Sequence, residues 1–192
     1  TLTFQGNCYR YEAQNLSWKS DGKEIAFSVG SIPYRVGMDG KLKELFNTRP
    51  ASDLKWSPVD DKILYTRSYG SHAGIYLTEA GKGKGKGLII DLLVNSPVWL
   101  PDGSGFLYIK GPDLCQYDFN SGHSKKLTNF NYSLEYIQSA DLSPDGKFIV
   151  YEYVDKSGGK YRRDLWIMER SNPNNKFQIT HDGKSYNPKW KP

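Results

Sequence analysis

The sequence is poor in the residues that most often build reactive centres. Its 192 residues include only two cysteines, Cys8 and Cys115, which lie far apart and lack metal-type spacing. We therefore expect two free thiols, with a single disulfide left open as an alternative. The three histidines, His72, His123 and His181, do not stand at equivalent positions of the repeat described below, so they do not suggest one metal site. From these residues we expect no metal, no cofactor and no catalytic residue.

Several longer patterns are also missing. No run of 18 apolar residues exists, so we expect no membrane span. No G-x-S-x-G elbow is present, so we expect the hydrolase domain that such a motif marks not to lie within these residues. The net charge is +5, but the basic residues are scattered and no nucleic-acid-binding motif is visible, which argues against nucleic acid as a partner.

One glycine-rich segment, GKGKGKG at residues 81–87, invites a phosphate-binding interpretation. It does not match G-x4-G-K-[ST], because Lys86 stands where the second glycine is required. No helix pattern follows it to supply an amino-terminal dipole. We interpret it as a flexible, solvated turn between two strands.

The composition that is present favours a folded β protein. Aromatic residues make up 14% of the chain, and 14 of them are tyrosines. The length favours one domain, residues 1–192. The first residue is Thr and no signal peptide is recognisable, so we expect a processed or excised form of a longer chain.

A turn followed by an apolar strand recurs along the chain. The copies read LSWKSDGKEIAF, LKWSPVDDKILY, PVWLPDGSGFLY and SADLSPDGKFIVY, and NPKWKP begins a fifth. Large side chains stand seven and nine residues after the anchor of each full copy, so they share one face of a strand. Three copies have Asp-Gly in the turn, whereas Asp60 replaces the glycine in the second copy, where we expect a looser turn. The anchors are Trp18, Trp56, Trp99, Leu142 and Trp190.

Two further strand-like segments complete each copy, which makes the repeat a four-stranded antiparallel meander without a helix. Such sheets, arranged radially, form a β-propeller, so the predicted fold is all-β with four complete blades. The repeat units are residues 14–51, 52–95, 96–137 and 138–186, with partial strands at 1–4 and 187–192. A four-bladed ring and a segment of a larger propeller both fit. The second would expose blade edges and favour association.

The motif Trp-x-Pro-Asp-Gly, followed by an Ile/Phe-x-Tyr strand and by Leu-Thr before the next Trp, resembles the WD40-like repeat of TolB-like β-propellers. The resemblance covers nearly the whole chain. It implies a place outside the cytoplasm: the periplasm, the cell surface or the secreted fraction. It also implies a non-catalytic propeller that binds a protein or ligand, as the TolB C-terminal domain does. The alternative it implies is the propeller domain of an enzyme, either a prolyl-oligopeptidase-type gating domain or a polysaccharide-active lyase or hydrolase.

Alternating strand directions separate two faces of the disc. One face carries the Asp-Gly turns and the turns between third and fourth strands; the other carries the remaining loops and the crossovers between blades. Tyr and Arg, which are enriched at interface hot spots, gather on the second face. We expect them to bind a protein, a cell-envelope component or a glycan; alternatively, the aromatics plug gaps between blades. The candidates are Tyr9, Arg10, Tyr11, Tyr69, His72, Tyr132, Tyr136, Tyr161, Arg162, Arg163 and Tyr186.

Overall fold

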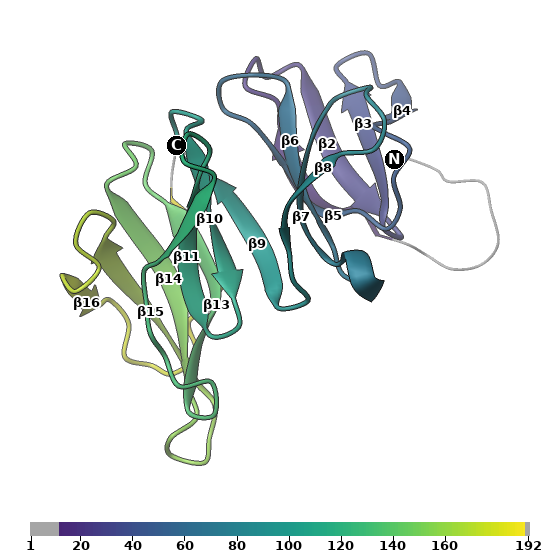
Figure 1. Ribbon diagram of the computed structural model, residues 1–192. Helices are drawn as coiled ribbons and strands as arrows, with labels where there is room; N and C mark the ends of the chain where they lie inside the picture. Colours follow the sequence, from purple (N-terminus) through teal and green to yellow (C-terminus); the bar gives the residue numbers. More distant parts are fainter. Residues whose placement is uncertain (1–11, 191–192) are drawn as a thin grey trace.

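The computed structural model describes residues 12–190, which form four four-stranded antiparallel sheets (Figure 1). Blade 1 consists of β1 (Gln14–Trp18), β2 (Glu24–Val29), β3 (Ile32–Gly37) and β4 (Leu42–Glu44). Blade 2 consists of β5 (Ser52–Trp56), β6 (Lys62–Arg67), β7 (Gly74–Glu79) and β8 (Lys86–Ile90). Blade 3 consists of β9 (Val94–Trp99), β10 (Gly105–Lys110), β11 (Asp113–Asp118) and β12 (His123–Lys126). Blade 4 consists of β13 (Glu135–Leu142), β14 (Phe148–Asp155), β15 (Arg162–Glu169) and β16 (Lys176–Gln178).

The strand order confirms the predicted all-β fold of four-stranded blades. Each sheet is a meander in which consecutive strands pair antiparallel. Across residues 12–190 the only helix is the short 3-10 turn η1 (Gly70–His72). No helix in this part of the chain has the length and apolar character needed to cross a bilayer.

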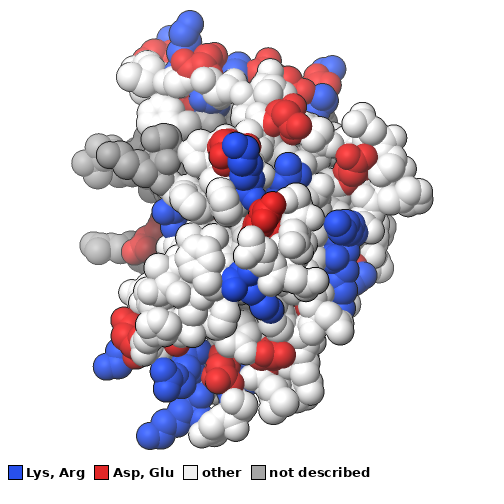
Figure 2. All heavy atoms as spheres, turned by 90° about the vertical axis from the view of Figure 1, so that its left-hand side faces the viewer, with Lys and Arg blue, Asp and Glu red and all other residues white. Residues whose placement is uncertain are grey.

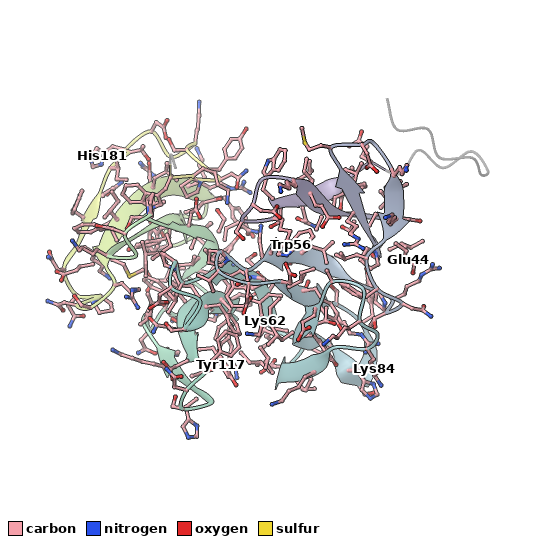
Figure 3. All side chains as sticks on the ribbon, turned by 90° about the horizontal axis from the view of Figure 1, so that it is seen from above. Glu44, Trp56, Lys62, Lys84, Tyr117 and His181 are labelled. Carbon is pink, nitrogen blue, oxygen red and sulfur yellow. The ribbon has the colours of Figure 1, made fainter. Side chains whose placement is uncertain are left out.

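The first strand of every blade lies innermost. β1 contacts β5, β5 contacts β9, and β9 contacts β13, so the blades pack in chain order. Seen from above in Figure 3, they are grouped around a common centre, with Trp56 near the middle and Glu44 and Lys84 on the outside.

The hydrophobic cores lie between blades, because both faces of each second strand are apolar. In β6, Ile63 and Tyr65 pack into the core shared with blade 1, whereas Leu64 between them packs into the core shared with blade 3. β10 repeats this arrangement with Phe106 and Leu107. Each fully buried side chain of this size contributes about 1.5–3 kcal/mol relative to exposure. The apolar residues that alternate along a second strand therefore pack its blade against both neighbouring blades.

The anchors pack against the preceding blade, which explains their different environments. Trp56 and Trp99 are buried, and the amide of Trp56 donates to Ser17 Oγ at 2.8 Å. Trp99 Nε1 donates to the Lys55 carbonyl at 2.8 Å. Trp18, by contrast, is 57% exposed, since no described strand precedes β1 on that side.

The two predicted partial strands have different outcomes. Residues 1–4 lie outside the described residues. The segment at 187–190 is seated on blade 4 but is not a strand. The Trp190 amide donates to Asp141 Oδ2 at 2.9 Å, and the Asn187 amide donates to Glu152 Oε2 at 3.1 Å. A first strand becomes regular by pairing with the second strand of its own blade, and none follows among the described residues.

The turns behave as the residue types predict. Gly22, Gly103 and Gly146 have φ of +68°, +70° and +70°, the left-handed region that glycine enters without a Cβ clash. Asp60 does not adopt positive φ. Its turn is held instead by Ser57 Oγ, which accepts from the amide of Asp60 at 3.3 Å. The turn of blade 2 thus lacks the backbone hydrogen bond by which the glycine amide closes the other three turns.

Candidate functional site

The predicted recognition residues fall into separate groups. Tyr9, Arg10 and Tyr11 lie outside the described residues. Tyr69 and His72 belong to the loop between β6 and β7. The residues on blade 4, with the crossover that enters it and the segment that follows β16, are Tyr132, Tyr136, Tyr161, Arg162, Arg163 and Tyr186.

Three of these tyrosines surround one ammonium group. Nζ of Lys156 lies 5.1 Å from the ring centre of Tyr132, 4.5 Å from that of Tyr136 and 5.7 Å from that of Tyr161. The Tyr132 and Tyr136 rings are 6.1 Å apart. We call Tyr132, Tyr136 and Tyr161 the tyrosine cage. It forms where the crossover, the start of β13 and the β14–β15 loop meet, at the lower end of Figure 1.

The backbone fixes Lys156 at the cage. The Lys156 amide donates to the Leu134 carbonyl at 2.7 Å, which ties the end of β14 to the crossover. Its Nζ donates to the Tyr132 carbonyl at 3.4 Å and forms no ion pair with any residue in the range 12–190. Cation–π contacts at exposed sites contribute about 0.5–1 kcal/mol each. The ring faces are therefore the principal partners of this ammonium.

The cage is open to solvent. Tyr132 is 62% exposed and Tyr161 is 66% exposed. Burial raises the pKa of Tyr136, and the neighbouring Tyr161 raises it further. The cage thus presents exposed ring faces, and the quadrupole of an aromatic ring attracts a cation.

The flanking arginines are partly engaged in the fold. Arg163 Nη1 lies 3.8 Å from Glu152 Oε1, a buried carboxylate that also accepts from Ser139 Oγ at 2.9 Å. Arg162 Nη2 lies 4.0 Å from Asp164 and donates to the His181 carbonyl at 3.5 Å. Both arginines border the cage, but their side chains are oriented by blade 4 itself.

The remaining candidates do not join this cluster. Tyr69 is 73% exposed and makes no ring contact with another described residue. Tyr186 is likewise exposed, and His72 bonds locally through Nδ1 to Ser71 Oγ at 3.0 Å. Among residues 12–190 no group of three or more His, Cys, Asp or Glu side chains could hold a metal ion. Cys115 is a buried free thiol, as expected for that residue.

A second recess, which the sequence did not indicate, lies among the inner strands of blades 2, 3 and 4. Its volume is about 320 Å³, and its lining includes Lys55, Trp99, Asp141 and Lys189. Burial lowers the pKa of Lys55, and the positive charge of Lys189 lowers it further. Asp141 is already occupied by the Trp190 amide and lies 3.9 Å from Lys189 Nζ. The recess therefore offers two amines and one engaged carboxylate.

The geometry and the comparisons agree on a β-propeller. No protein-family model and no curated protein matches the sequence. Among solved structures, the putative TolB from Agrobacterium tumefaciens superposes with a TM-score of 0.76 at 19% identity, over 91% of this chain and 64% of that one. TolB from Acinetobacter baumannii gives a TM-score of 0.70 at 22% identity, over 84% and 42%. An oligogalacturonate lyase in complex with manganese gives 0.63 at 14%, over 93% and 58%.

These likenesses establish the fold and its TolB-like blade architecture. This chain spans less than two thirds of the length of each of these three structures. A propeller hosts many unrelated functions, so activity has to be argued from the site.

Proposed function

We propose that this chain is a non-catalytic binding propeller that acts outside the cytoplasm, in the periplasm or at the cell surface. It recognises a protein or another cell-envelope component through the tyrosine cage. The observation that carries the proposal is the convergence of Tyr132, Tyr136 and Tyr161 on the Lys156 ammonium from three segments. The extracytoplasmic place rests on the resemblance to TolB-like propellers.

The bound ammonium indicates the chemistry of the ligand. A site that holds a lysine Nζ among three ring faces suits another cationic side chain, so the partner presents a Lys or Arg. Two of the rings are largely exposed, and tyrosine is typical of the residues that dominate binding energy at interfaces. The incoming cation would take the place of Lys156, which could swing into solvent on its flexible stem.

The fold alone does not choose between binding and catalysis. The structural neighbours include an oligogalacturonate lyase and the dipeptidyl peptidase 4 of Porphyromonas gingivalis, beside the TolB proteins. The tyrosine cage favours binding, because aromatic ring faces around a cation suit recognition better than proton transfer.

Selection of peptides from a displayed random library on the folded protein tests this proposal. We expect enrichment of peptides that contain Lys or Arg. Their affinity should fall at least about tenfold, or 1.4 kcal/mol, in the triple variant Tyr132→Ala/Tyr136→Ala/Tyr161→Ala. Tyr69→Ala is the matched control, since this exposed tyrosine lies outside the cage. Equal binding of the selected peptides to the wild type and the triple variant would contradict the proposal.

A second variant tests whether the ligand displaces the Lys156 side chain from the cage or binds in contact with it. Lys156→Ala removes the internal cation, so basic peptides should bind at least as tightly as to the wild type. Loss of binding in Lys156→Ala as large as in the triple variant would show that the ligand needs the lysine and does not replace it. A glycan array probed with the same variants reports whether the cage serves a sugar ligand instead.

A further inference from the structure

A basic recess lies on the outer rim where blade 1 meets blade 2. Its volume is about 280 Å³, and no acidic side chain lines it. Three lining residues are Arg or Lys, a fourth is a histidine, and the other two carry an amide and a hydroxyl. We call it the rim pocket; it is lined by Asn47, Thr48, Arg49, Arg67, His72 and Lys84.

The positive charge in the rim pocket is not balanced from within the described chain. Glu44 accepts from Arg49 Nη2 at 3.3 Å, and this is the only ion pair that a lining residue makes within residues 12–190. Arg67 and Lys84 have no carboxylate partner in that range. On the side that carries β16, Figure 2 shows acidic and basic atoms interspersed, as in a typical solvated surface. The rim pocket, by contrast, is lined by basic and uncharged residues alone.

Two lining groups retain unused hydrogen-bonding capacity. Arg67 stacks its guanidinium over the Tyr76 ring at 5.4 Å, which leaves the in-plane N–H groups free, and its Nε is buried without an acceptor. Thr48 is only 7% exposed; its hydroxyl faces that of Tyr65 but makes no hydrogen bond of normal geometry. Buried polar atoms are nearly always satisfied, so the Arg67 Nε–H in particular is available to an acceptor from a ligand.

The glycine-rich segment places Lys84 at this pocket. The Gly81 amide donates to the Leu45 carbonyl at 3.0 Å, which holds the turn of blade 2 against blade 1. A Cβ on Gly85 would stand 2.8 Å from both the Leu77 carbonyl oxygen and the Tyr65 hydroxyl, so only glycine lets the chain pass there. The turn does connect β7 and β8 as predicted, but its alternating glycines also direct one lysine to a site.

We propose that the rim pocket binds an oxyanion, the phosphate, sulfate or carboxylate group of a ligand. Arg67 provides the in-plane donors, and a stacked guanidinium matches an oxyanion in a bidentate fork. Arg49 and Lys84 add positive charge to the lining, and Thr48 adds a hydroxyl. This site is separate from the tyrosine cage and does not depend on the proposed function.

Titration of the folded protein with inorganic phosphate and with acetate, at constant ionic strength set by chloride, tests the proposal by NMR. We expect saturable shifts of the Arg67 Nε–Hε resonance and of the amides at residues 47–49. Response to phosphate alone assigns a tetrahedral oxyanion, and response to acetate alone assigns a carboxylate. No saturable shift with either ion overturns the proposal.

Substitutions in and beside the rim pocket test whether the oxyanion binds there. Arg67→Gln and, separately, the exposed Lys84→Gln should each weaken the responding ion about tenfold, as expected for loss of a charge-assisted contact. Lys82→Gln is the matched control, because Lys82 belongs to the same turn but pairs with Glu79 at 2.8 Å and does not line the pocket. If Arg67→Gln does not fold, Lys84→Gln decides alone. Equal weakening by Lys82→Gln and Lys84→Gln would indicate diffuse attraction and would overturn the site.

Discussion

Replacement of Asp113 by alanine tests how a blade fastens its outer edge. Asp113 begins β11 and is only 2% exposed. Its Oδ1 accepts from Thr128 Oγ1 at 2.9 Å and from the Phe130 amide at 2.8 Å, and its Oδ2 lies 2.7 Å from Lys126 Nζ. Thr128 Oγ1 in turn accepts from the Leu114 amide at 3.0 Å. One carboxylate therefore closes the segment after β12 onto the start of β11.

The expected loss follows from the partners left behind. Without the carboxylate, the Thr128 hydroxyl and the Phe130 amide lose their acceptor in a part-buried position. Hydrogen bonds to a charged group contribute about 1.5–3 kcal/mol each, and the ion pair with exposed Lys126 adds little. We expect Asp113→Ala to lower the free energy of unfolding by about 3–5 kcal/mol, a range typical of one-sided removal of a buried charged partner.

Urea unfolding at pH 7, followed by tryptophan fluorescence, measures this loss. Asp118→Ala is the control, because Asp118 ends the same strand in a half-exposed position and bonds only the turn at Ser121. Blade 4 repeats the arrangement with Asp164, which accepts from Thr180 Oγ1 at 3.3 Å and from the Gly183 amide at 3.0 Å. Its longer bonds predict a smaller loss in Asp164→Ala. A loss below about 1 kcal/mol for Asp113→Ala would refute the reasoning.

Three further predictions concern backbone approach, a thiol and a carboxylate. Gly105→Ala should lower Tm by several degrees, because a Cβ would stand 2.1 Å from a backbone oxygen of β11; Gly158→Ala, with no atom within 4 Å, should leave Tm unchanged. Burial raises the pKa of Cys115, so in a Cys8→Ser background a thiol reagent at pH 8 should label it no faster than the protein unfolds; immediate labelling would contradict this. The Ser143 hydroxyl, followed by the Lys147 amide, lowers the pKa of Asp145, so its stabilising contribution is present above the unfolded pKa and is lost as pH falls through the folded pKa. Carboxyl NMR should give a pKa for Asp145 below that of an unperturbed aspartate.

The sequence predicted the blades well because each depends on local pattern. The Asp-Gly turns require a left-handed residue, and Gly22 and Gly146 adopt it. Apolar residues on both faces of a second strand predict a core on each side of it. The second strand of blade 2 does contribute alternate residues to two cores. The pattern did not predict the exposure of Trp18, because burial of an anchor depends on the preceding blade and not on its own repeat.

For the candidate site, the sequence predicted only the face of the propeller on which its residues lie. Strand direction placed Tyr132, Tyr136 and Tyr161 on the crossover side, but their convergence depends on two irregular segments that follow no period. The sequence did not indicate a role for Lys156, since single lysines are common after strands. The sequence correctly distinguished the segment that contains Lys84 from phosphate-binding loops that precede a helix. It could not predict the rim pocket, because the other residues that line the pocket come from distant segments.

Both candidate sites occur where a longer crossover enters a blade, and packing gives the reason. The cores between blades are closed by alternating apolar residues, so much of the recognition chemistry comes from segments outside the sheet ladders, joined by residues at strand ends such as Tyr136 and Arg67. The crossover at residues 45–51 lines the rim pocket, and the one at 127–134 supplies Tyr132 to the cage. The crossover at 91–93 is too short to fold over a neighbour, and it leaves Leu92 and Leu93 exposed. Crossover length, which varies without disturbing the blades, therefore sets where this fold can build a site.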